Sequence, residues 1–381
     1  MKTRAALLFS QPGKWEVTDI ELDEPKQHEV LVKIMAAGLC HSDDHLATGD
    51  VPSGHFPYCG GHEGAGVVET VGSAVRSVQP GDHVVLSFVP SCGRCRWCSQ
   101  GLQNLCDNGA MMLMGCQLDG TFRMHLGASP ASPEAHVNGE DVAQAAMTGT
   151  FTQYTVVSEW GVIKIDDDIP FAEAALVGCG VPTGWGSAVA ACGVRPGDVH
   201  IVMGVGGIGI NAIQGARHAG ASVIIAVDPV PFKRDSALQL GATHAFETIE
   251  EAGDFARSIT NGQGADSAVV SVGVVKSEHV GQAFSTVRKA GTLAVTGVSN
   301  INEVGIPVSL FELSMFQKRI QGVLFGCLSP AQDVPRLINL YKAGQLKLSE
   351  LITREYTLDE INQGYEDMHA GRNIRGVIRF D

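Results

Sequence analysis

The stretch His200-Ile-Val-Met-Gly-Val-Gly-Gly-Ile-Gly209 decides the fold of the central part of the chain. It begins as a short apolar strand, and its glycines then match the pattern G-x-G-x-x-G at the start of a helical stretch. Glycines at these places allow a tight turn and let a pyrophosphate approach the positive end of the helix. The sequence therefore predicts a dinucleotide-binding loop formed by Gly204, Gly206, Gly207, Ile208 and Gly209.

An acidic residue supports this prediction. Asp228 ends the next predicted strand, nineteen residues after Gly209, where a carboxylate binds the adenosine ribose diol and repels a 2′-phosphate. Lys233, five residues further on, is also within reach of the adenosine ribose. A glycine-rich turn without a ligand is the alternative, but strand, helix and acid together favour NAD over NADP.

The organisation of the chain indicates an α/β protein with two domains. From about residue 181, apolar strands alternate with helical stretches, which predicts a parallel, doubly wound sheet over 181–324. Residues 1–180 begin as short alternating strands separated by glycine and proline turns, which predicts a β-rich domain. After residue 324 the pattern becomes irregular again, and the simplest interpretation is that 325–381 returns to complete the first domain.

Composition excludes several classes of partner. The formal net charge of −14 and the lack of a Lys/Arg cluster argue against nucleic acid. No apolar run is long enough to span a bilayer, so no membrane partner is expected. The N-terminal segment lacks the apolar core and cleavage site of a secretory signal, so we expect a cytoplasmic protein.

A close cysteine cluster predicts a metal site in a lobe at 92–106. Four cysteines follow the spacing C-x2-C-x2-C-x7-C, which suits one tetrahedral zinc without an open position. Disulfides are disfavoured in a chain that lacks a secretory signal. The predicted structural zinc ligands are Cys92, Cys95, Cys98 and Cys106.

A third, dispersed group combines Cys40, His62 and Cys179. Two thiolates and one imidazole form a ligand set that leaves a fourth zinc position for substrate. Taken singly, a buried cysteine is usually a small hydrophobic residue and a histidine a satisfied polar group. The residues that flank them favour the metal site.

With these segments together, the chain resembles the zinc-dependent medium-chain alcohol dehydrogenases over essentially its full length. The resemblance rests on the motifs around Cys40, His62 and Cys179, the cysteine lobe, the glycine loop with Asp228, and G-R-N-I-R ending at Arg375. It implies a GroES-like catalytic domain built from both chain ends and an inserted Rossmann domain. It also implies two zinc ions per chain, one structural and one catalytic.

The resemblance also assigns roles around the catalytic zinc. Glu63 would be a transient ligand, and Asp43 would orient the His62 imidazole, unless it only caps a loop. Zinc would lower the pKa of the alcohol hydroxyl so that hydride passes to the nicotinamide and an aldehyde forms. The proton would leave through Ser42, the nicotinamide ribose and His45. The alternative is that Ser42 and His45 only satisfy loop backbone groups.

Further cofactor and substrate contacts follow from the same resemblance. His41 stands where many relatives have an arginine facing the pyrophosphate, and Arg375 would supply that charge instead, unless it lies on the surface. Thr183 and Val298 would frame the nicotinamide. Phe88 and Phe151 would line the substrate pocket, although aromatic residues in such strands often belong to the core.

One subgroup fits especially well. The opening MKTRAALL, the segment CHSDDHLATGD and a long stretch at 107–150 resemble actinobacterial nicotinoprotein alcohol dehydrogenases that work with the dye N,N-dimethyl-4-nitrosoaniline (NDMA). In that subgroup NAD stays bound, and an external acceptor of the mycofactocin type re-oxidises it. The long stretch would trap the cofactor if it covered it; a surface excursion is the alternative.

Other functions stay open at this point. An ordinary NAD-exchanging alcohol dehydrogenase or a thiol-dependent formaldehyde dehydrogenase would share the zinc chemistry. A non-catalytic zinc- and NAD-binding redox sensor belongs to another class, but no catalytic position of the family is lost. We expect a small primary alcohol or its aldehyde as substrate, an external redox acceptor, and a homo-oligomer of unspecified size.

Overall fold

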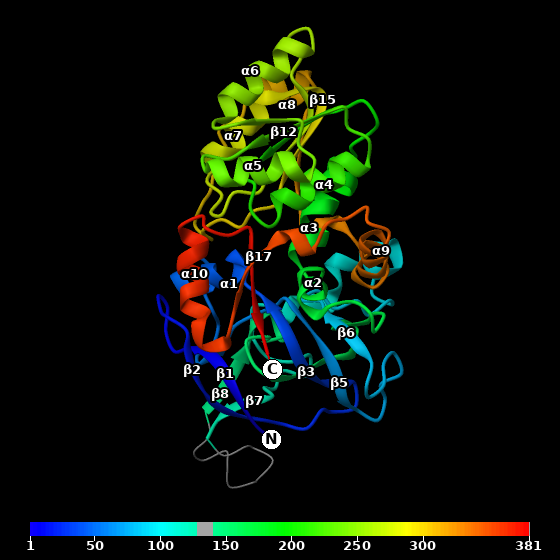
Figure 1. The fold of residues 1–381 in the computed structure, drawn as a ribbon, viewed down its shortest axis with the longest axis vertical. Helices are drawn as coiled ribbons and strands as arrows, with labels where there is room; N and C mark the ends of the chain where they lie inside the picture. The colour runs from blue at the N-terminus through cyan, green and yellow to red at the C-terminus, as the bar shows by residue number, and fades with distance from the viewer. Residues whose placement is uncertain (128–139, 381) are drawn as a thin grey trace. The chain divides into compact units, whose positions relative to one another are not determined.

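The computed structural model describes residues 1–127 and 140–380, which form two compact units. Unit 1 comprises Met1–Cys179, Ser329–Asn339 and Leu348–Asp381, and unit 2 comprises Gly180–Leu328 and Leu340–Lys347. The two ends of the chain therefore belong to the same unit (Figure 1). Within the described ranges, no helix is long and apolar enough to cross a membrane.

Unit 1 is built on a closed barrel and a seven-stranded sheet. The barrel order is β1-β2-β7-β8-β4, and the sheet order is β10-β6-β5-β3-β18-β17 with β9 also paired to β3. The barrel strands are β1 (Lys2–Leu8), β2 (Glu16–Leu22), β4 (Tyr58–Cys59), β7 (Met124–Leu126) and β8 (Glu140–Gln144). The sheet strands are β3 (Glu29–Gly38), β5 (Gly64–Val71), β6 (His83–Leu86), β9 (Tyr154–Ser158), β10 (Val162–Lys164), β17 (Ile352–Tyr356) and β18 (Arg375–Arg379).

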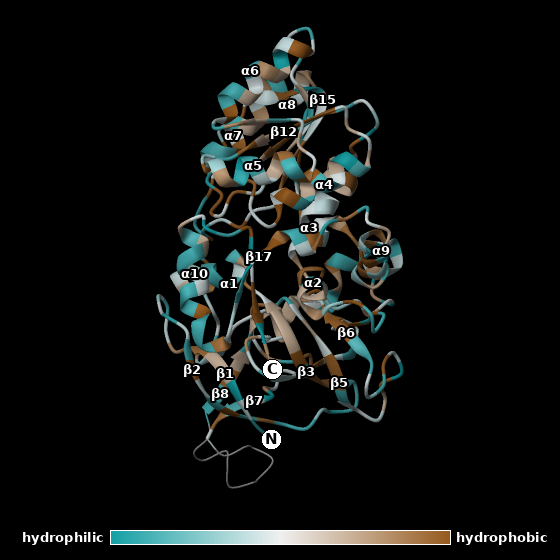
Figure 2. Cartoon of the chain, in the orientation of Figure 1, coloured by the Kyte–Doolittle hydropathy of each residue, from teal (hydrophilic) through white to brown (hydrophobic). Residues whose placement is uncertain are grey.

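The C-terminal return completes the sheet of unit 1. Strand β18 pairs antiparallel with β3, with Val377 opposite Gly38. Alternate residues of β3 such as Val30, Val32 and Ile34 have no exposed surface and lie in one apolar cluster. Figure 2 shows β3 and β6 with hydrophobic colouring, whereas α10 is largely hydrophilic. Among the described residues, the α-helices of unit 1 are α1 (His41–Thr48), α2 (Phe171–Leu176) and α10 (Ile361–His369). Helix α9 (Pro330–Lys342) begins in unit 1 and ends in unit 2.

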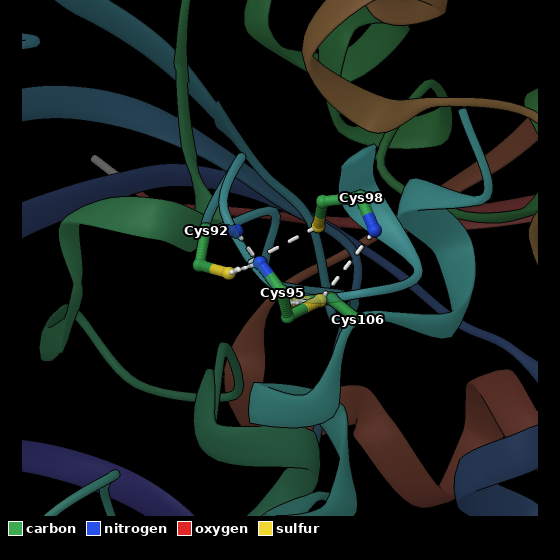
Figure 3. A group of neighbouring side chains, drawn as sticks. All are labelled: Cys92, Cys95, Cys98 and Cys106. Atoms are coloured by element: carbon green, nitrogen blue, oxygen red, sulfur yellow. Dashed lines mark hydrogen bonds between the residues drawn. The ribbon is translucent and has the colours of Figure 1, made fainter. Parts of the chain in front are cut away.

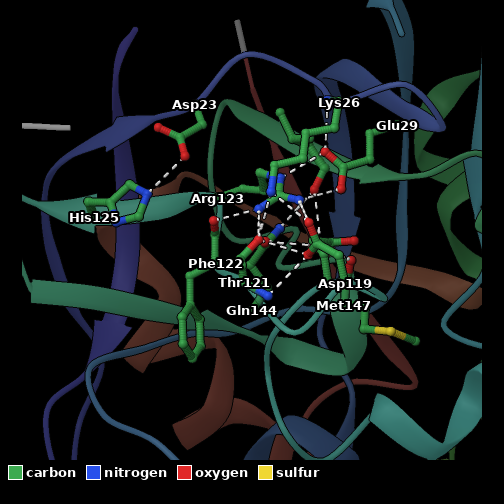
Figure 4. Close-up of polar contacts among 12 residues, drawn as sticks. Asp23, Lys26, Glu29, Asp119, Thr121, Phe122, Arg123, His125, Gln144 and Met147 are labelled. Carbon is green, nitrogen blue, oxygen red and sulfur yellow. Dashed lines mark hydrogen bonds and ion pairs between the residues drawn. The ribbon is translucent and has the colours of Figure 1, made fainter. Parts of the chain in front are cut away.

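A buried ion pair ties the start of β3 to the loop before β7 (Figure 4). The Arg123 guanidinium donates two hydrogen bonds to the Glu29 carboxylate, at 2.7 and 2.6 Å. It also donates to Asp119 at 3.0 Å, and Asp119 accepts a further bond from Lys26 at 2.6 Å. Because Arg123 is fully buried, these acceptors compensate its lost hydration.

Unit 2 is a six-stranded parallel sheet with the order β13-β12-β11-β14-β15-β16. This order reverses at β11, as in a Rossmann fold, so the predicted α/β class is confirmed. Its strands are β11 (Val199–Met203), β12 (Val223–Val227), β13 (His244–Phe246), β14 (Ala265–Val270), β15 (Val287–Val295) and β16 (Arg319–Gly322). Its helices are α3 (Gly180–Gly186), α4 (Gly209–His218), α5 (Pro231–Leu240), α6 (Ile249–Ile259), α7 (Ser277–Thr286) and α8 (Leu310–Met315).

Candidate active site and metal centres

Four buried side chains of unit 1 converge on one point. The ligand atoms of Cys40, His62, Glu63 and Cys179 all lie within 4.8 Å of one another. Cys40 follows β3 in an extended conformation, His62 and Glu63 directly precede β5, and Cys179 follows α2. Segments far apart in the sequence therefore supply the predicted ligand set. Two thiols, an imidazole and a carboxylate fit a zinc ion with a variable fourth ligand.

Asp43 lies where it can hold the His62 ring. Its Oδ2 is 2.9 Å from Nδ1 of His62, and its Oδ1 accepts the backbone N–H of Gly61 at 2.9 Å. Because Nδ1 faces the carboxylate, Nε2 is the nitrogen available to a metal. The Phe88 ring packs edge-on against the imidazole with centroids 5.4 Å apart. Asp43 thus combines the orienting contact with the loop contact that was its alternative.

Arg375 forms a buried ion pair with Glu63. Its Nη2 donates to Oε2 of Glu63 and, at 3.3 Å, to the carbonyl of Leu39. Burial raises the pKa of Glu63 to about 7, although the Arg375 guanidinium acts to lower it. The alternative that Arg375 is a surface residue is wrong, because the residue is buried. A Cβ on Gly38 would lie 2.0 Å from Oε2 of Glu63, so this glycine makes room for the pair.

The predicted proton-relay residues lie on α1. Ser42 Oγ is 3.7 Å from Cys40 Sγ, and the His45 side chain is almost completely buried. The rings of His41 and His45 have centroids 6.5 Å apart. Sequence reasoning missed Asp50, whose Oδ2 lies 3.2 Å from Nδ1 of His45. Its position five residues after His45, beyond a helix-ending glycine, was the available signal.

The four cysteines of the lobe gather tightly in Figure 3. The sulfurs of Cys92 and Cys98, and those of Cys95 and Cys106, are each 4.0 Å apart. Such separations match a tetrahedral zinc with Zn–S bonds of about 2.3 Å. The backbone N–H of Cys98 lowers the pKa of Cys95 to about 6, whereas burial raises the pKa of Cys98 to about 12. Because burial disfavours ionised sulfur at Cys98, four thiolates in this lobe would require a cation to stabilise them. The four-sulfur donor set fits zinc.

The glycine loop of unit 2 has the geometry of a phosphate cradle. Gly204 has φ of 88°, and a Cβ on Gly209 would lie 1.9 Å from the carbonyl oxygen of Gly204. A Cβ on Gly206 would meet nothing within 4 Å, which leaves open space at the start of α4. Oδ2 of Asp228 accepts the N–H of Val205 at 2.9 Å, so the acid lies directly beside the loop. These features fit a dinucleotide.

The remaining predicted contacts have mixed outcomes. Thr183 is buried on α3, and among the described residues its hydroxyl has no hydrogen-bond partner, as expected of a group reserved for a ligand. The Val298 carbonyl accepts the N–H of Val275 at 2.9 Å, and Lys233 is partly exposed on α5. The prediction that Phe151 lines a pocket is corrected, because its ring is fully buried against Trp15, 5.5 Å between centroids. A position matched by resemblance alone does not separate core from pocket.

Comparison with known proteins gives the family. Residues 26–167 match the alcohol dehydrogenase GroES-like domain, and residues 207–343 match the zinc-binding dehydrogenase family. The chain is 50% identical to NDMA-dependent alcohol dehydrogenase of Amycolatopsis methanolica, over 99% of both proteins. The chain belongs to the zinc-dependent medium-chain alcohol dehydrogenases. Such a dehydrogenase is an oxidoreductase that uses zinc and a nicotinamide dinucleotide.

Two further relatives show that substrates differ within this dehydrogenase family. S-(hydroxymethyl)glutathione dehydrogenase of Paracoccus denitrificans is 35% identical over 100% of both chains. The crystal structure of benzyl alcohol dehydrogenase from Acinetobacter calcoaceticus superposes with a TM-score of 0.88 at 29% identity, covering 100% of both chains. One fold therefore carries more than one substrate, and the substrate must be inferred from the site.

Proposed function

We propose that the protein oxidises small primary alcohols to aldehydes with NAD as the hydride acceptor. The observation that carries this proposal is the convergence of Cys40, His62, Glu63 and Cys179 within 4.8 Å. When bound, zinc supplies a Lewis acid that lowers the pKa of an alcohol hydroxyl, and the nicotinamide accepts a hydride. The Asp228 carboxylate beside the glycine loop favours NAD over NADP.

The chain's own residues would orient these groups and remove the proton. Cys40, His62 and Cys179 would hold the ion, and Asp43 keeps Nδ1 of His62 away from it. The Glu63 carboxylate, paired with Arg375, lies beside these three ligands and would be available to coordinate the ion transiently. Ser42 and His45 would carry the hydroxyl proton away from the substrate. Phe88 would provide an apolar wall beside the His62 imidazole.

We further propose that NAD stays bound through turnover and that an external acceptor such as mycofactocin re-oxidises it. The support is the 50% identity to an NDMA-dependent relative over nearly the whole chain. The long stretch at 107–150, which was predicted to cover the cofactor, gives no direct support to the proposal that NAD stays bound. Residues 128–139 lie outside the described residues, and β7 and β8 on either side belong to the barrel.

The test is to add a primary alcohol to thoroughly desalted protein without free NAD and to record NADH absorbance. A trapped cofactor predicts a rise of at most one equivalent per chain, with continued aldehyde formation only after NDMA is added. Turnover that starts only on addition of free NAD would contradict trapping and leave an ordinary alcohol dehydrogenase.

A thiol-dependent formaldehyde dehydrogenase is the second candidate, because a 35% identical relative is an S-(hydroxymethyl)glutathione dehydrogenase. Competition between a primary alcohol and S-(hydroxymethyl)glutathione separates the two functions. We expect the alcohol to have the higher kcat/KM. A strong preference for the glutathione adduct would favour the second candidate.

We also propose that unit 2 pairs with a second copy. Strand β16 lies at the edge of the sheet, with Arg319, Gln321 and Gly322 exposed. On nearby α8, Leu310, Phe311 and Met315 are each at least 66% exposed. An uncovered strand edge beside exposed apolar side chains favours association.

A further inference from the structure

The contact between Asp50 and His45 suggests a role that the metal site does not explain. The His45 side chain is 2% exposed and that of Asp50 is 26% exposed, with 3.2 Å between Nδ1 and Oδ2. A buried imidazole needs its ring nitrogens satisfied, and a carboxylate is a stronger acceptor than a neutral group. Asp50 is therefore placed to determine the state of this ring.

The local backbone brings the carboxylate to the histidine. Helix α1 ends at Thr48, and Gly49 caps it with a φ of 88° that reverses the chain, so that Asp50 faces back along the helix. The N–H groups of Gly49 and Val51 both donate to the His45 carbonyl at 3.1 Å. The Thr48 hydroxyl donates to Oδ2 of Asp50 at 3.0 Å. The carboxylate oxygen is thus held between the hydroxyl and the imidazole.

A second segment fixes the loop that carries Asp50. The Gln11 amide nitrogen donates to the carbonyls of Leu46 and, at 3.0 Å, of Val51. Its amide oxygen accepts the N–H of Ser53 at 3.0 Å. One side chain from the loop after β1 therefore clamps the loop on both sides of Asp50.

We propose that Asp50 is a positioning residue that selects the tautomer of His45. An ionised carboxylate can only accept, so Nδ1 carries the proton and the lone pair resides on Nε2. When Nε2 takes up the substrate proton, the ring gains a positive charge and Asp50 stabilises it, without itself binding the proton. This inference rests on the proposed function, in which His45 receives the proton through Ser42.

The test compares Asp50→Asn with Asp50→Glu. The Asn amide can donate to Nδ1 and so favours the opposite tautomer, whereas Glu retains a carboxylate. We expect kcat for alcohol oxidation to fall by about tenfold or more in D50N with little change in KM, and to recover in part in D50E. The matched control is D141N, which removes another carboxylate contact to a buried histidine, 3.0 Å from Nδ1 of His125. The control should keep the wild-type kcat.

A second measurement does not depend on activity. In protein labelled with ¹⁵N-histidine, the His45 signals, assigned by their loss in His45→Gln, should show a protonated Nδ1 in the wild type and a protonated Nε2 in D50N. An unchanged tautomer in D50N, or equal loss of kcat in D50N and D141N, would overturn the proposal. If the wild type oxidises no alcohol, the proposed function fails, while the tautomer measurement still decides the role of Asp50.

Discussion

Arg123 shows what a single residue contributes to unit 1. Its buried guanidinium pairs with both Glu29 and Asp119. Truncation would leave the buried Glu29 carboxylate without its cation, whereas Asp119 would keep Lys26. Removing one member of a buried pair costs about 3–5 kcal/mol. We predict that Arg123→Ala lowers the thermal unfolding midpoint by on the order of 10 °C, measured by calorimetry.

The control for this substitution is Arg4→Ala. Arg4 contacts Asp359 at 2.6 Å, but both side chains are about half exposed or more. An exposed pair contributes less than about 1 kcal/mol. An equal decrease of the thermal midpoint in the two variants would contradict the claim that burial makes the Arg123 ion pair more stabilising than an exposed one.

At the residue scale, local spacing in the sequence predicted the metal and dinucleotide motifs, but it did not predict side-chain contacts between distant residues. The cysteine lobe and the glycine loop are readable because their ligands lie within a few residues of one another. Glu29 and Arg123 are 94 residues apart, and Glu63 and Arg375 are 312 apart, so no local pattern joins them. The role assigned to His45 by resemblance stays a prediction that the Asp50 variants test, and the roles assigned to Ser42 and Asp43 stay predictions.

Among the elements, the cysteine lobe, described over all of 92–106, contains no long helix or strand, and its four cysteines would hold it together through zinc. It contains only short 3-10 turns such as Cys98–Gln100 and Gln103–Leu105. We predict that Cys95→Ser loses about one zinc per chain in metal analysis, because a tetrahedral site with three thiolates binds more weakly. Cys192→Ser, outside both clusters, should retain both ions. Full zinc content in Cys95→Ser would contradict the structural site.

Strand β11 carries an acid-sensitive histidine. His200 is fully buried, its Nδ1 is 2.8 Å from Ser267 Oγ, and burial lowers its pKa to about 4. The unfolded chain binds this proton near pH 6.5 and the folded chain does not, so stability falls as the pH drops from about 6.5 to about 4.

The expected loss across this window is up to about 3 kcal/mol, with no effect above it. We predict that His200→Gln flattens the decline of the thermal midpoint between these pH values relative to the wild type. The comparison cancels acid effects common to both proteins, including loss of metal. Parallel pH curves for the two proteins would show that His200 does not carry this sensitivity.

At the element scale, the sequence predicted the strand, glycine loop and helix of β11 and α4 correctly because their periodicities differ sharply. It did not predict the barrel. Strands β4 and β7 have two and three residues, too short for a period-two pattern, and they form only through pairing with β1, β2 and β8. The loop that presents Asp50 was also missed, because hydrogen bonds from Gln11 fix it.

For the whole molecule, the exposed edge of unit 2 predicts a homo-oligomer. Phe311 is 66% exposed on α8, so Phe311→Glu should weaken association without unfolding unit 2. Light scattering coupled to size exclusion should show a smaller mass for this variant than for the wild type. Phe9→Glu, at a residue 43% exposed in unit 1, is the control. A monomeric wild type would contradict the prediction.

The sequence also predicted an α/β chain with an inserted parallel sheet, since glycine and apolar patterns change near residues 180 and 325. The exact boundaries 1–180, 181–324 and 325–381 stay a prediction. In the structure, Leu340–Lys347 groups with unit 2, which no composition change signals. The unit to which Leu340–Lys347 belongs is decided by its packing against residues that are distant in the sequence.

Isotopic labelling tests whether hydride passes from an alcohol to the nicotinamide. The protein is incubated with a 1,1-dideuterated primary alcohol, and the nicotinamide cofactor is then analysed by mass spectrometry. We predict one deuterium on the reduced cofactor in the wild type and none in Cys179→Ser, whose ligand set is broken. Aldehyde formation with an unlabelled cofactor, or equal labelling in Cys179→Ser, would contradict it.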